Sequence, residues 1–101
     1  ATLCYGGTGS ITATANVDPR VPVEIYEAFQ AGDHKRALEA QYRLAPLRIA
    51  FGLGTFPVVI KEALNMIGIE AGPAIAPVGP MTSENLDKLR KVLAGMGLLK
   101  D

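Results

Sequence analysis

The sequence predicts an α/β fold that is mostly helical within its 101 residues, with one short strand followed by four helices. The first 17 residues carry no charge, and within them hydroxyl-bearing and apolar residues alternate as in a strand. Beyond Asp18, apolar residues recur at helical spacing. A single strand cannot satisfy its own backbone hydrogen bonds, so we expect it to complete a sheet made by another part of a larger polypeptide. The alternative is an all-helical domain with an irregular arm.

The opening stretch contains a turn and then the predicted strand. Residues 5–9 (Tyr-Gly-Gly-Thr-Gly) are too rich in glycine for a helix. Residues 10–15 (Ser-Ile-Thr-Ala-Thr-Ala) alternate and include β-branched types, which favours a strand covered by protein on both faces. Asp18 and Pro19 end this strand, because Asp18 can cap a helix and Pro19 suits its first turn.

Two helices are predicted next, from Arg20 to Ala31 and from His34 to about Phe51. Gly32 stops the first helix and Asp33 caps the second. Pro46 lies inside the second helix and should kink it, because proline has no backbone N–H to donate. The first helix has an apolar face, and the second repeats its core-facing positions at helical spacing: Ile25, Tyr26, Phe29; Ala37, Leu38, Gln41, Leu44, Ala45, Arg48.

A third helix follows residues 55–57 (Thr-Phe-Pro), with Thr55 as its cap, and ends at Gly68. Residues 71–81 hold three prolines and two glycines, which indicates an extended connector. Thr82 caps the last helix, where Glu84 in the first turn suits the helix dipole. The apolar positions of these two helices are Val59, Ile60, Ala63, Leu64 and Ile67, then Leu86, Leu89, Val92, Leu93 and Met96.

Composition and charge narrow the class of protein. Ten Lys and Arg residues balance ten Asp and Glu residues, so the formal net charge is zero. This balance argues against a nucleic-acid or membrane-surface binder, since such proteins carry a basic excess. The one cysteine, Cys4, allows neither an intramolecular disulfide nor a multi-cysteine metal site. No apolar run reaches the ~18 residues of a membrane span. We therefore expect a cytoplasmic protein with no metal and no cofactor.

A series of motifs follows in fixed order along the chain. They are residues 6–17 (Gly-Gly-Thr-Gly-Ser-Ile-Thr-Ala-Thr-Ala-Asn-Val), 31–33 (Ala-Gly-Asp), 43–47 (Arg-Leu-Ala-Pro-Leu), 56–65 (Phe-Pro-Val-Val-Ile-Lys-Glu-Ala-Leu-Asn), 68–69 (Gly-Ile) and 76–78 (Ala-Pro-Val). Together these motifs resemble one enzyme family, that of dihydrodipicolinate synthase and N-acetylneuraminate lyase. The resemblance covers essentially the whole chain and corresponds to the C-terminal part of a (β/α)₈ (TIM) barrel. Such a barrel needs ~250 residues. Residues 1–17 would hold the turn and last barrel strand, and residues 18–101 the outer and C-terminal helices.

The resemblance implies class I aldolase chemistry, in which a lysine forms a Schiff base with pyruvate or another 2-keto acid. That lysine, and a tyrosine that relays protons, are expected outside this chain, so no catalytic residue is assigned here. Ile11 matches the position whose backbone carbonyl faces the lysine and substrate. The commonest reaction, condensation of pyruvate with aspartate semialdehyde toward lysine, is expected. Cleavage of 2-keto-3-deoxy sugar acids, 4-hydroxy-2-oxoglutarate or N-acetylneuraminate is the alternative. The expected partners are the N-terminal barrel segment and, in a homotetramer, further copies of the same protein.

Other residues that could carry chemistry have simpler interpretations. Lys61 lies in an apolar helix beside Glu62, and we interpret it as a structural lysine. Cys4 has an apolar context, which predicts a buried small side chain. His34 starts a charged helix and is predicted to lie on the surface. The acidic side chains of the helices are predicted to form solvated faces: Glu24, Glu27 and Glu39.

Two non-catalytic functions also remain open from the sequence. The apolar first strand could dock onto the sheet edge of another protein, which would make the chain a helical interaction module. Gly7 and Gly9 could cradle a phosphate, but a dinucleotide fingerprint follows a strand and opens a helix, whereas these glycines precede the strand.

Overall fold

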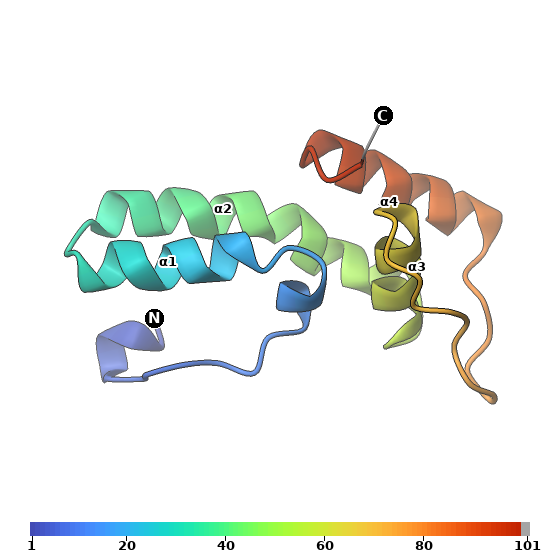
Figure 1. Cartoon of the computed structure of the whole chain (residues 1–101), viewed down its shortest axis with the longest axis horizontal. Helices are drawn as coiled ribbons and strands as arrows, with labels where there is room; N and C mark the ends of the chain where they lie inside the picture. Colours follow the sequence, from blue (N-terminus) through green and yellow to red (C-terminus); the bar gives the residue numbers. More distant parts are fainter. Residues whose placement is uncertain (100–101) are drawn as a thin grey trace. The chain divides into compact units, whose positions relative to one another are not determined.

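The computed structural model describes residues 1–99, which divide into two compact units, residues 1–44 and residues 45 onward. Its elements are helical: η1 (Leu3–Tyr5), η2 (Ala13–Asn16), α1 (Arg20–Gln30), α2 (His34–Ala50), η3 (Phe51–Leu53), α3 (Val58–Met66) and α4 (Ser83–Gly95) (Figure 1). The four α-helices lie where the sequence predicts them. The division between the units falls inside α2, next to Pro46, and α2 continues through this proline without a break.

In the first unit, α1 and the beginning of α2 form a helical hairpin (Figure 1). Gly32 has a φ of +75°, a value that favours glycine, and closes the turn between the helices. The predicted cap of α2 is confirmed, because the Asp33 carboxylate accepts a hydrogen bond from the Arg36 amide at 3.0 Å. Glu24 on α1 pairs with Arg36 and Arg43 on α2, so it is not the simple solvated carboxylate that the sequence predicts. These ion pairs link the two helices.

The predicted strand over residues 10–15 is not formed within residues 1–99. Residues 7–12 run as open chain, and Thr12 keeps an extended backbone with φ −124° and ψ 116° (Figure 1). Ala13–Asn16 instead form the 3₁₀-helix η2. A strand needs a neighbour for its backbone groups, and no described segment pairs with this one. Amides in and after the second half of this segment therefore donate to nearby carbonyls: the Val17 amide donates to the Thr14 carbonyl at 3.0 Å.

Three further predictions about local structure are wrong. Asp18 does not cap α1, because Pro19 takes the N-cap position and the helix start has no side-chain cap. Thr55 does not cap α3 with its side chain; its carbonyl accepts from the Val58 amide at 2.8 Å. The side of α2 that is buried differs from the predicted side, because apolar residues lie on several sides of this helix. Of the predicted positions only Leu44 is buried, together with Ala40, Leu47 and Ala50.

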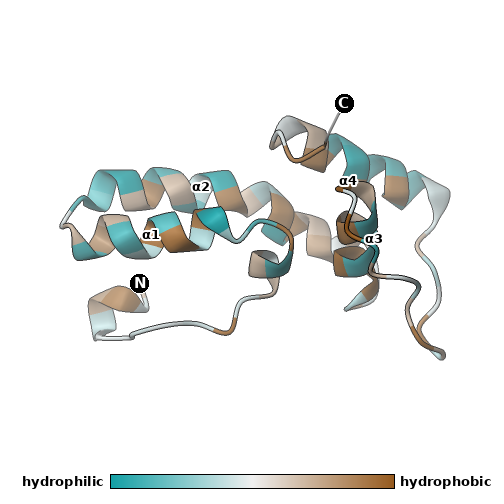
Figure 2. Cartoon of the chain, viewed as in Figure 1, coloured by the Kyte–Doolittle hydropathy of each residue, from teal (hydrophilic) through white to brown (hydrophobic). Residues whose placement is uncertain are grey.

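In the second unit, α3 packs on α4, and η3 contacts both helices. Apolar residues concentrate on α3 (Figure 2). Of the apolar positions that the sequence predicts for α3 and α4, five are buried: Val59, Ile60, Ala63, Leu89 and Leu93. The other five are only half-buried (Leu64, Ile67, Leu86, Val92 and Met96), whereas Val58, which was not among them, is buried. Residues 71–81 form no helix or strand, as predicted for the connector. Thr82 caps α4 by accepting from the Asn85 amide at 3.3 Å. The Asn85 side chain donates to the Leu53 carbonyl at 2.8 Å and so ties α4 to η3.

Candidate functional site

The candidate site begins at Ile11, the one substrate-binding residue that the sequence suggests. Its side chain is fully exposed, with a relative accessibility of 109%, and Tyr5 nearby in sequence is 91% exposed. An uncharged segment with exposed large apolar side chains is unfavourable in water, because each such side chain gains ~1.5–3 kcal/mol on burial. The geometry of this segment therefore suits a chain that is covered by further protein.

A tight turn follows Ile11 and connects it to α1. The hydroxyls of Thr12 and Thr14 lie 2.9 Å apart and share a hydrogen bond. The Asn16 side chain donates to the Ala13 carbonyl at 3.1 Å, which reinforces the same turn. Thr14 is buried, with 2% of its surface exposed. The family resemblance implies that Thr14, like Gly9 and Thr12, lines the same end of the barrel as Ile11, but it gives Thr14 no role. A threonine between two alanines in an uncharged stretch is a signal of a buried hydroxyl.

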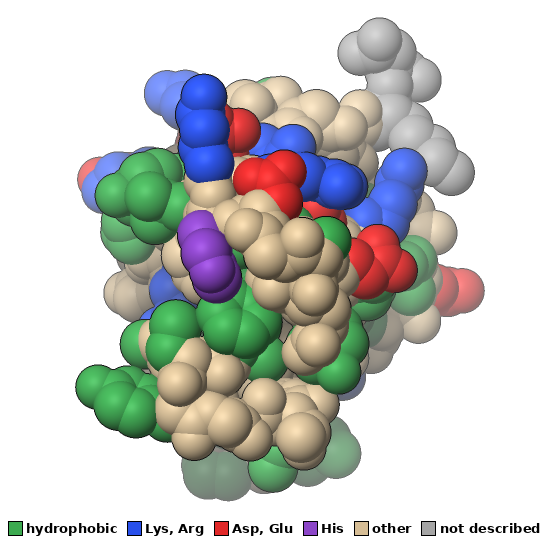
Figure 3. Space-filling view, turned by 90° about the vertical axis from the view of Figure 1, so that its left-hand side faces the viewer, with side chains coloured by type: hydrophobic (Ala, Val, Ile, Leu, Met, Phe, Trp, Pro, Cys, Tyr) green, Lys and Arg blue, Asp and Glu red, His purple; other side chains and the backbone are tan. Residues whose placement is uncertain are grey.

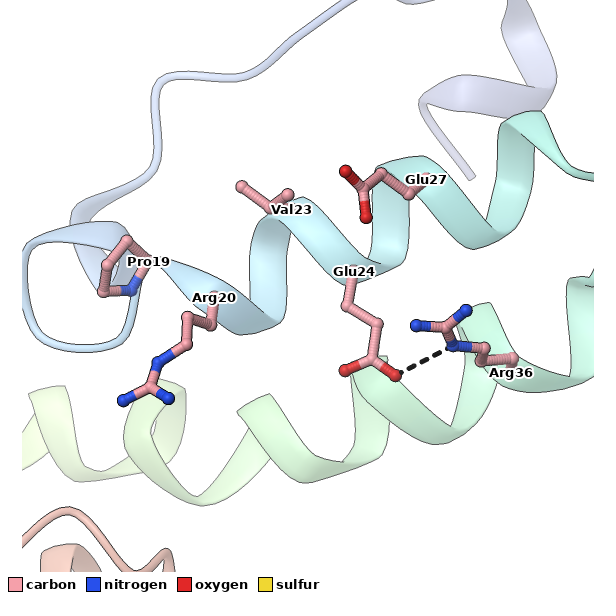
Figure 4. A pocket seen from close by; sticks show the side chains of 6 residues that line it. All are labelled: Pro19, Arg20, Val23, Glu24, Glu27 and Arg36. Carbon is pink, nitrogen blue, oxygen red and sulfur yellow. Dashed lines mark hydrogen bonds and ion pairs between the residues drawn. The ribbon is translucent and has the colours of Figure 1, made fainter.

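A shallow hollow of about 360 Å³ lies along α1 and the start of α2 (Figure 4). Its lining residues are Pro19, Arg20, Val23, Glu24, Glu27 and Arg36. Glu24 is engaged within the hollow by Arg36, whose Nε lies 3.1 Å from Oε1. The hydrogen bond from Arg36, followed by that from Arg43, holds the pKa of the Glu24 carboxyl below its ordinary value. Charged side chains of both signs gather toward one side of the face seen in Figure 3.

A second hollow of about 410 Å³ lies between α3 and the first turns of α4. It is lined by Glu62, Asn65, Met66, Ser83, Leu86, Asp87 and Arg90. Asn65 is occupied elsewhere, because its Oδ1 accepts from the Ala71 amide at 2.9 Å. This role of Asn65 has no signal in the local sequence.

Lys61 has the structural role that the sequence predicts. Its Nζ donates to the carbonyl oxygens of Ala71 at 2.9 Å and of Pro73 at 3.0 Å. A lysine that forms a Schiff base attacks as a neutral amine with a free lone pair. The Lys61 amine is instead held by two backbone carbonyls that it ties to α3, so this geometry suits a structural role and not a nucleophile.

The predictions for the other candidate residues, Cys4 and His34, have different outcomes. The prediction that Cys4 is buried is wrong, because it is exposed in the 3₁₀-helix η1. His34 is on the surface, as predicted, with its ring edge-on to Phe29 at 5.3 Å. A Cβ at Gly7 would come within 2.6 Å of the Thr2 side chain, so Gly7 permits a close turn.

No group of three His, Cys, Asp or Glu side chains within residues 1–99 could hold a metal ion. Over the same residues, no helix has the length and apolar character needed to cross a bilayer.

Comparison with known proteins assigns the chain to a family. The model of the dihydrodipicolinate synthetase family matches residues 1–96. The chain belongs to this family. The predicted family is therefore confirmed over nearly the whole chain.

Two curated relatives from methanogens carry the same name, 4-hydroxy-tetrahydrodipicolinate synthase. The protein of Methanothrix thermoacetophila is 48% identical over 94 residues, which is 93% of this chain and 32% of the relative. That of Methanoculleus marisnigri is 43% identical over 95 residues, 94% of this chain and 33% of the relative. The chain thus spans about a third of the length of the curated relatives it matches.

Solved structures of family members match the fold. The dihydrodipicolinate synthase of Thermotoga maritima aligns with a TM-score of 0.89 and 34% identity, covering 96% of this chain and 33% of that protein. A prophage protein of Escherichia coli K12 from the same family, solved in complex with pyruvate, aligns with a TM-score of 0.84 and 30% identity, covering 96% of this chain and 33% of that one. These neighbours are TIM barrels, so the predicted fold class, part of a (β/α)₈ barrel, is confirmed.

Proposed function

We propose that this chain is the C-terminal part of a pyruvate-dependent Schiff-base lyase, a 4-hydroxy-tetrahydrodipicolinate synthase that condenses pyruvate with aspartate semialdehyde. In this proposal residues 1–17 provide the turn and the last barrel strand, and residues 18–101 provide the outer and C-terminal helices. The complete enzyme is a cytoplasmic homotetramer. The N-terminal barrel segment supplies the Schiff-base lysine and the proton-relay tyrosine.

One observation carries this proposal: the family match over residues 1–96 includes an extended segment whose Ile11 side chain is not covered by any part of residues 1–99. Every strand of a closed barrel pairs on both sides, because closure leaves no edge. The open backbone of residues 7–12 has groups available for such pairing. The names of the two curated relatives support the synthase reaction, and the pyruvate complex of the prophage protein supports the keto-acid substrate.

The residues of this chain would act at the end of the last strand rather than in the covalent step. The Ile11 carbonyl would accept a hydrogen bond at the site where the Schiff base forms. A carbonyl at this place accepts a hydrogen bond and so holds the donor group in a fixed direction. It also keeps water away from one side of that group. Lys61 would take no part, since its amine already donates to two carbonyls.

A hybrid barrel tests the proposal. It is the Methanothrix thermoacetophila relative in which the matched third is replaced by this chain; the two are 48% identical there. The hybrid barrel is incubated with pyruvate and borohydride, and the trapped peptide is identified by mass spectrometry. We expect one reduced pyruvate adduct, on a lysine outside residues 1–101, and the same adduct in a Lys61→Met variant. Absence of a pyruvate-dependent adduct from a folded hybrid barrel, or an adduct on Lys61, would contradict the proposal.

The choice of second substrate is tested in the same preparation. We expect turnover with pyruvate and aspartate semialdehyde, and little with N-acetylneuraminate or 2-keto-3-deoxy sugar acids. Because loops from the rest of the barrel also set specificity, the unmodified relative is the control. Co-expression of this chain with the remaining two thirds of the relative, followed by native mass measurement, tests the homotetramer.

A further inference from the structure

We infer that Thr14 is a positioning residue for the Ile11 carbonyl. This inference rests on the proposed function, in which that carbonyl faces the substrate. It adds a residue that touches no substrate itself.

The Thr14 hydroxyl is almost completely removed from solvent, with 2% of the residue exposed. A buried hydroxyl without a partner costs roughly 1–3 kcal/mol. Its partner is the hydroxyl of Thr12, 2.9 Å away, on a residue that is only half-buried. The side chain of Thr12 is thereby fixed by a group anchored in the interior of the first unit.

The backbone around Thr14 is fixed as well. Its carbonyl accepts from the amides of Val17 at 3.0 Å and Asp18 at 2.9 Å, and both of these residues are buried. The helix η2 that contains Thr14 contacts α1. Thr14 therefore connects the opening segment to the helical hairpin through its side chain and its main chain.

This arrangement limits the directions that the Ile11 carbonyl can take. The Thr12 carbonyl accepts from the Ala15 amide at 3.3 Å, so Thr12 is held at both its carbonyl and its hydroxyl. The Ile11–Thr12 peptide plane then depends chiefly on the φ angle of Thr12, which is −124°. The Ile11 side chain is fully exposed, so among residues 1–99 it does not hold this peptide in place. The hydroxyl pair holds Thr12 against η2, which leaves the φ angle of Thr12 as the main torsion that sets the direction of the Ile11 carbonyl.

Three variants of the hybrid barrel test the role of Thr14. Thr14→Val keeps the shape and removes the hydroxyl; we expect the KM for pyruvate to rise about 3- to 10-fold, the equivalent of one lost hydrogen bond. Thr14→Ser keeps the hydroxyl and should stay within about twofold of the parent, in line with the same estimate. Thr82→Ala is the control, because it removes a hydroxyl that caps α4 and lowers stability without touching the turn. Its KM for pyruvate should not change.

A double-mutant cycle gives the second readout. Thr12→Val breaks the same hydrogen bond from its half-buried side and should raise the KM for pyruvate as Thr14→Val does. The double variant should be no worse than either single one. Additive effects, an unchanged KM in Thr14→Val, or an equal rise in Thr82→Ala would overturn the role of Thr14. If the parent hybrid barrel traps no pyruvate, the proposed function fails and the role of Thr14 fails with it. If Thr14→Val does not fold, Thr12→Val decides.

Discussion

The Nζ of Lys61 donates to the carbonyl oxygen of Ala71 at 2.9 Å, across ten residues of sequence. Asn65, one helical turn further along α3, accepts from the amide of Ala71 at 2.9 Å and donates to Gly72 O at 3.5 Å. Gly72 has a φ of +68°, so the chain bends there and brings the Pro73 carbonyl to the same ammonium. Two side chains of α3 therefore hold the start of the connector that leads to α4.

Replacing Lys61 by methionine should lower the free energy of unfolding of the hybrid barrel by about 1–3 kcal/mol, since two hydrogen bonds from a charged donor are lost. Methionine keeps most of the aliphatic length, so packing changes little. Urea unfolding measures the effect. Lys91→Met, at an exposed lysine of α4, is the matched control and should stay within about 0.5 kcal/mol of the parent. Equal losses in both variants would show that the connector contacts contribute nothing.

The Glu24 ion pairs should make stability depend on pH. Because Arg36 and Arg43 hold the pKa of Glu24 below its ordinary value of 4.5, their stabilisation is complete above that pH. It is lost as the pH falls through the lowered pKa of the folded protein. We expect Glu24→Gln to reduce the loss of thermal stability of the hybrid barrel between about pH 5 and pH 3. High salt should reduce it too, because the pairs are partly exposed.

Glu27→Gln is the control for this measurement, since Glu27 is exposed and makes no ion pair within residues 1–99. Its pH profile should match that of the parent. A Glu24→Gln profile that also matches the parent would mean that the pairs with Arg36 and Arg43 do not contribute in solution.

Gly54 tests the packing of the second unit. A Cβ there would lie 3.1 Å from the side chains of Met81 and Val59 and 3.3 Å from that of Val58, all of them buried. Valines in a helix have one preferred rotamer and cannot move aside freely. Gly54→Ala should therefore destabilise the hybrid barrel by about 1–2 kcal/mol. Gly52→Ala, where a Cβ would meet nothing within 4 Å, should not. A Gly54→Ala variant as stable as Gly52→Ala would contradict this packing.

The sequence predicts the α-helices well because their signals are local. Gly32 and Asp33 mark a helix end and a helix start within two residues, and Thr82 marks the start of α4. The family motifs likewise predict the fold class. Predictions of this kind depend on a few neighbouring residues and on helical spacing.

Contacts between distant residues could not be predicted in the same way. Nothing in the local sequence of Asn85 indicates that its side chain reaches the Leu53 carbonyl, 32 residues earlier. The same is true of Asn65 and the connector. Residues 10–15 fail for another reason: their pattern is that of a strand, but a strand forms only with a partner, and the described chain offers none. Cys4 and Tyr5 are exposed in the same uncharged stretch.

Amide hydrogen exchange of residues 7–12 tests most directly whether this segment is a barrel strand. It is measured by mass spectrometry on the 101-residue chain by itself and in the hybrid barrel. We expect rapid exchange in the isolated chain and strong protection in the hybrid barrel, because pairing with neighbouring strands protects backbone amides. Equal protection in the two preparations, whether high or low, would contradict the assignment of residues 7–12 to a barrel strand.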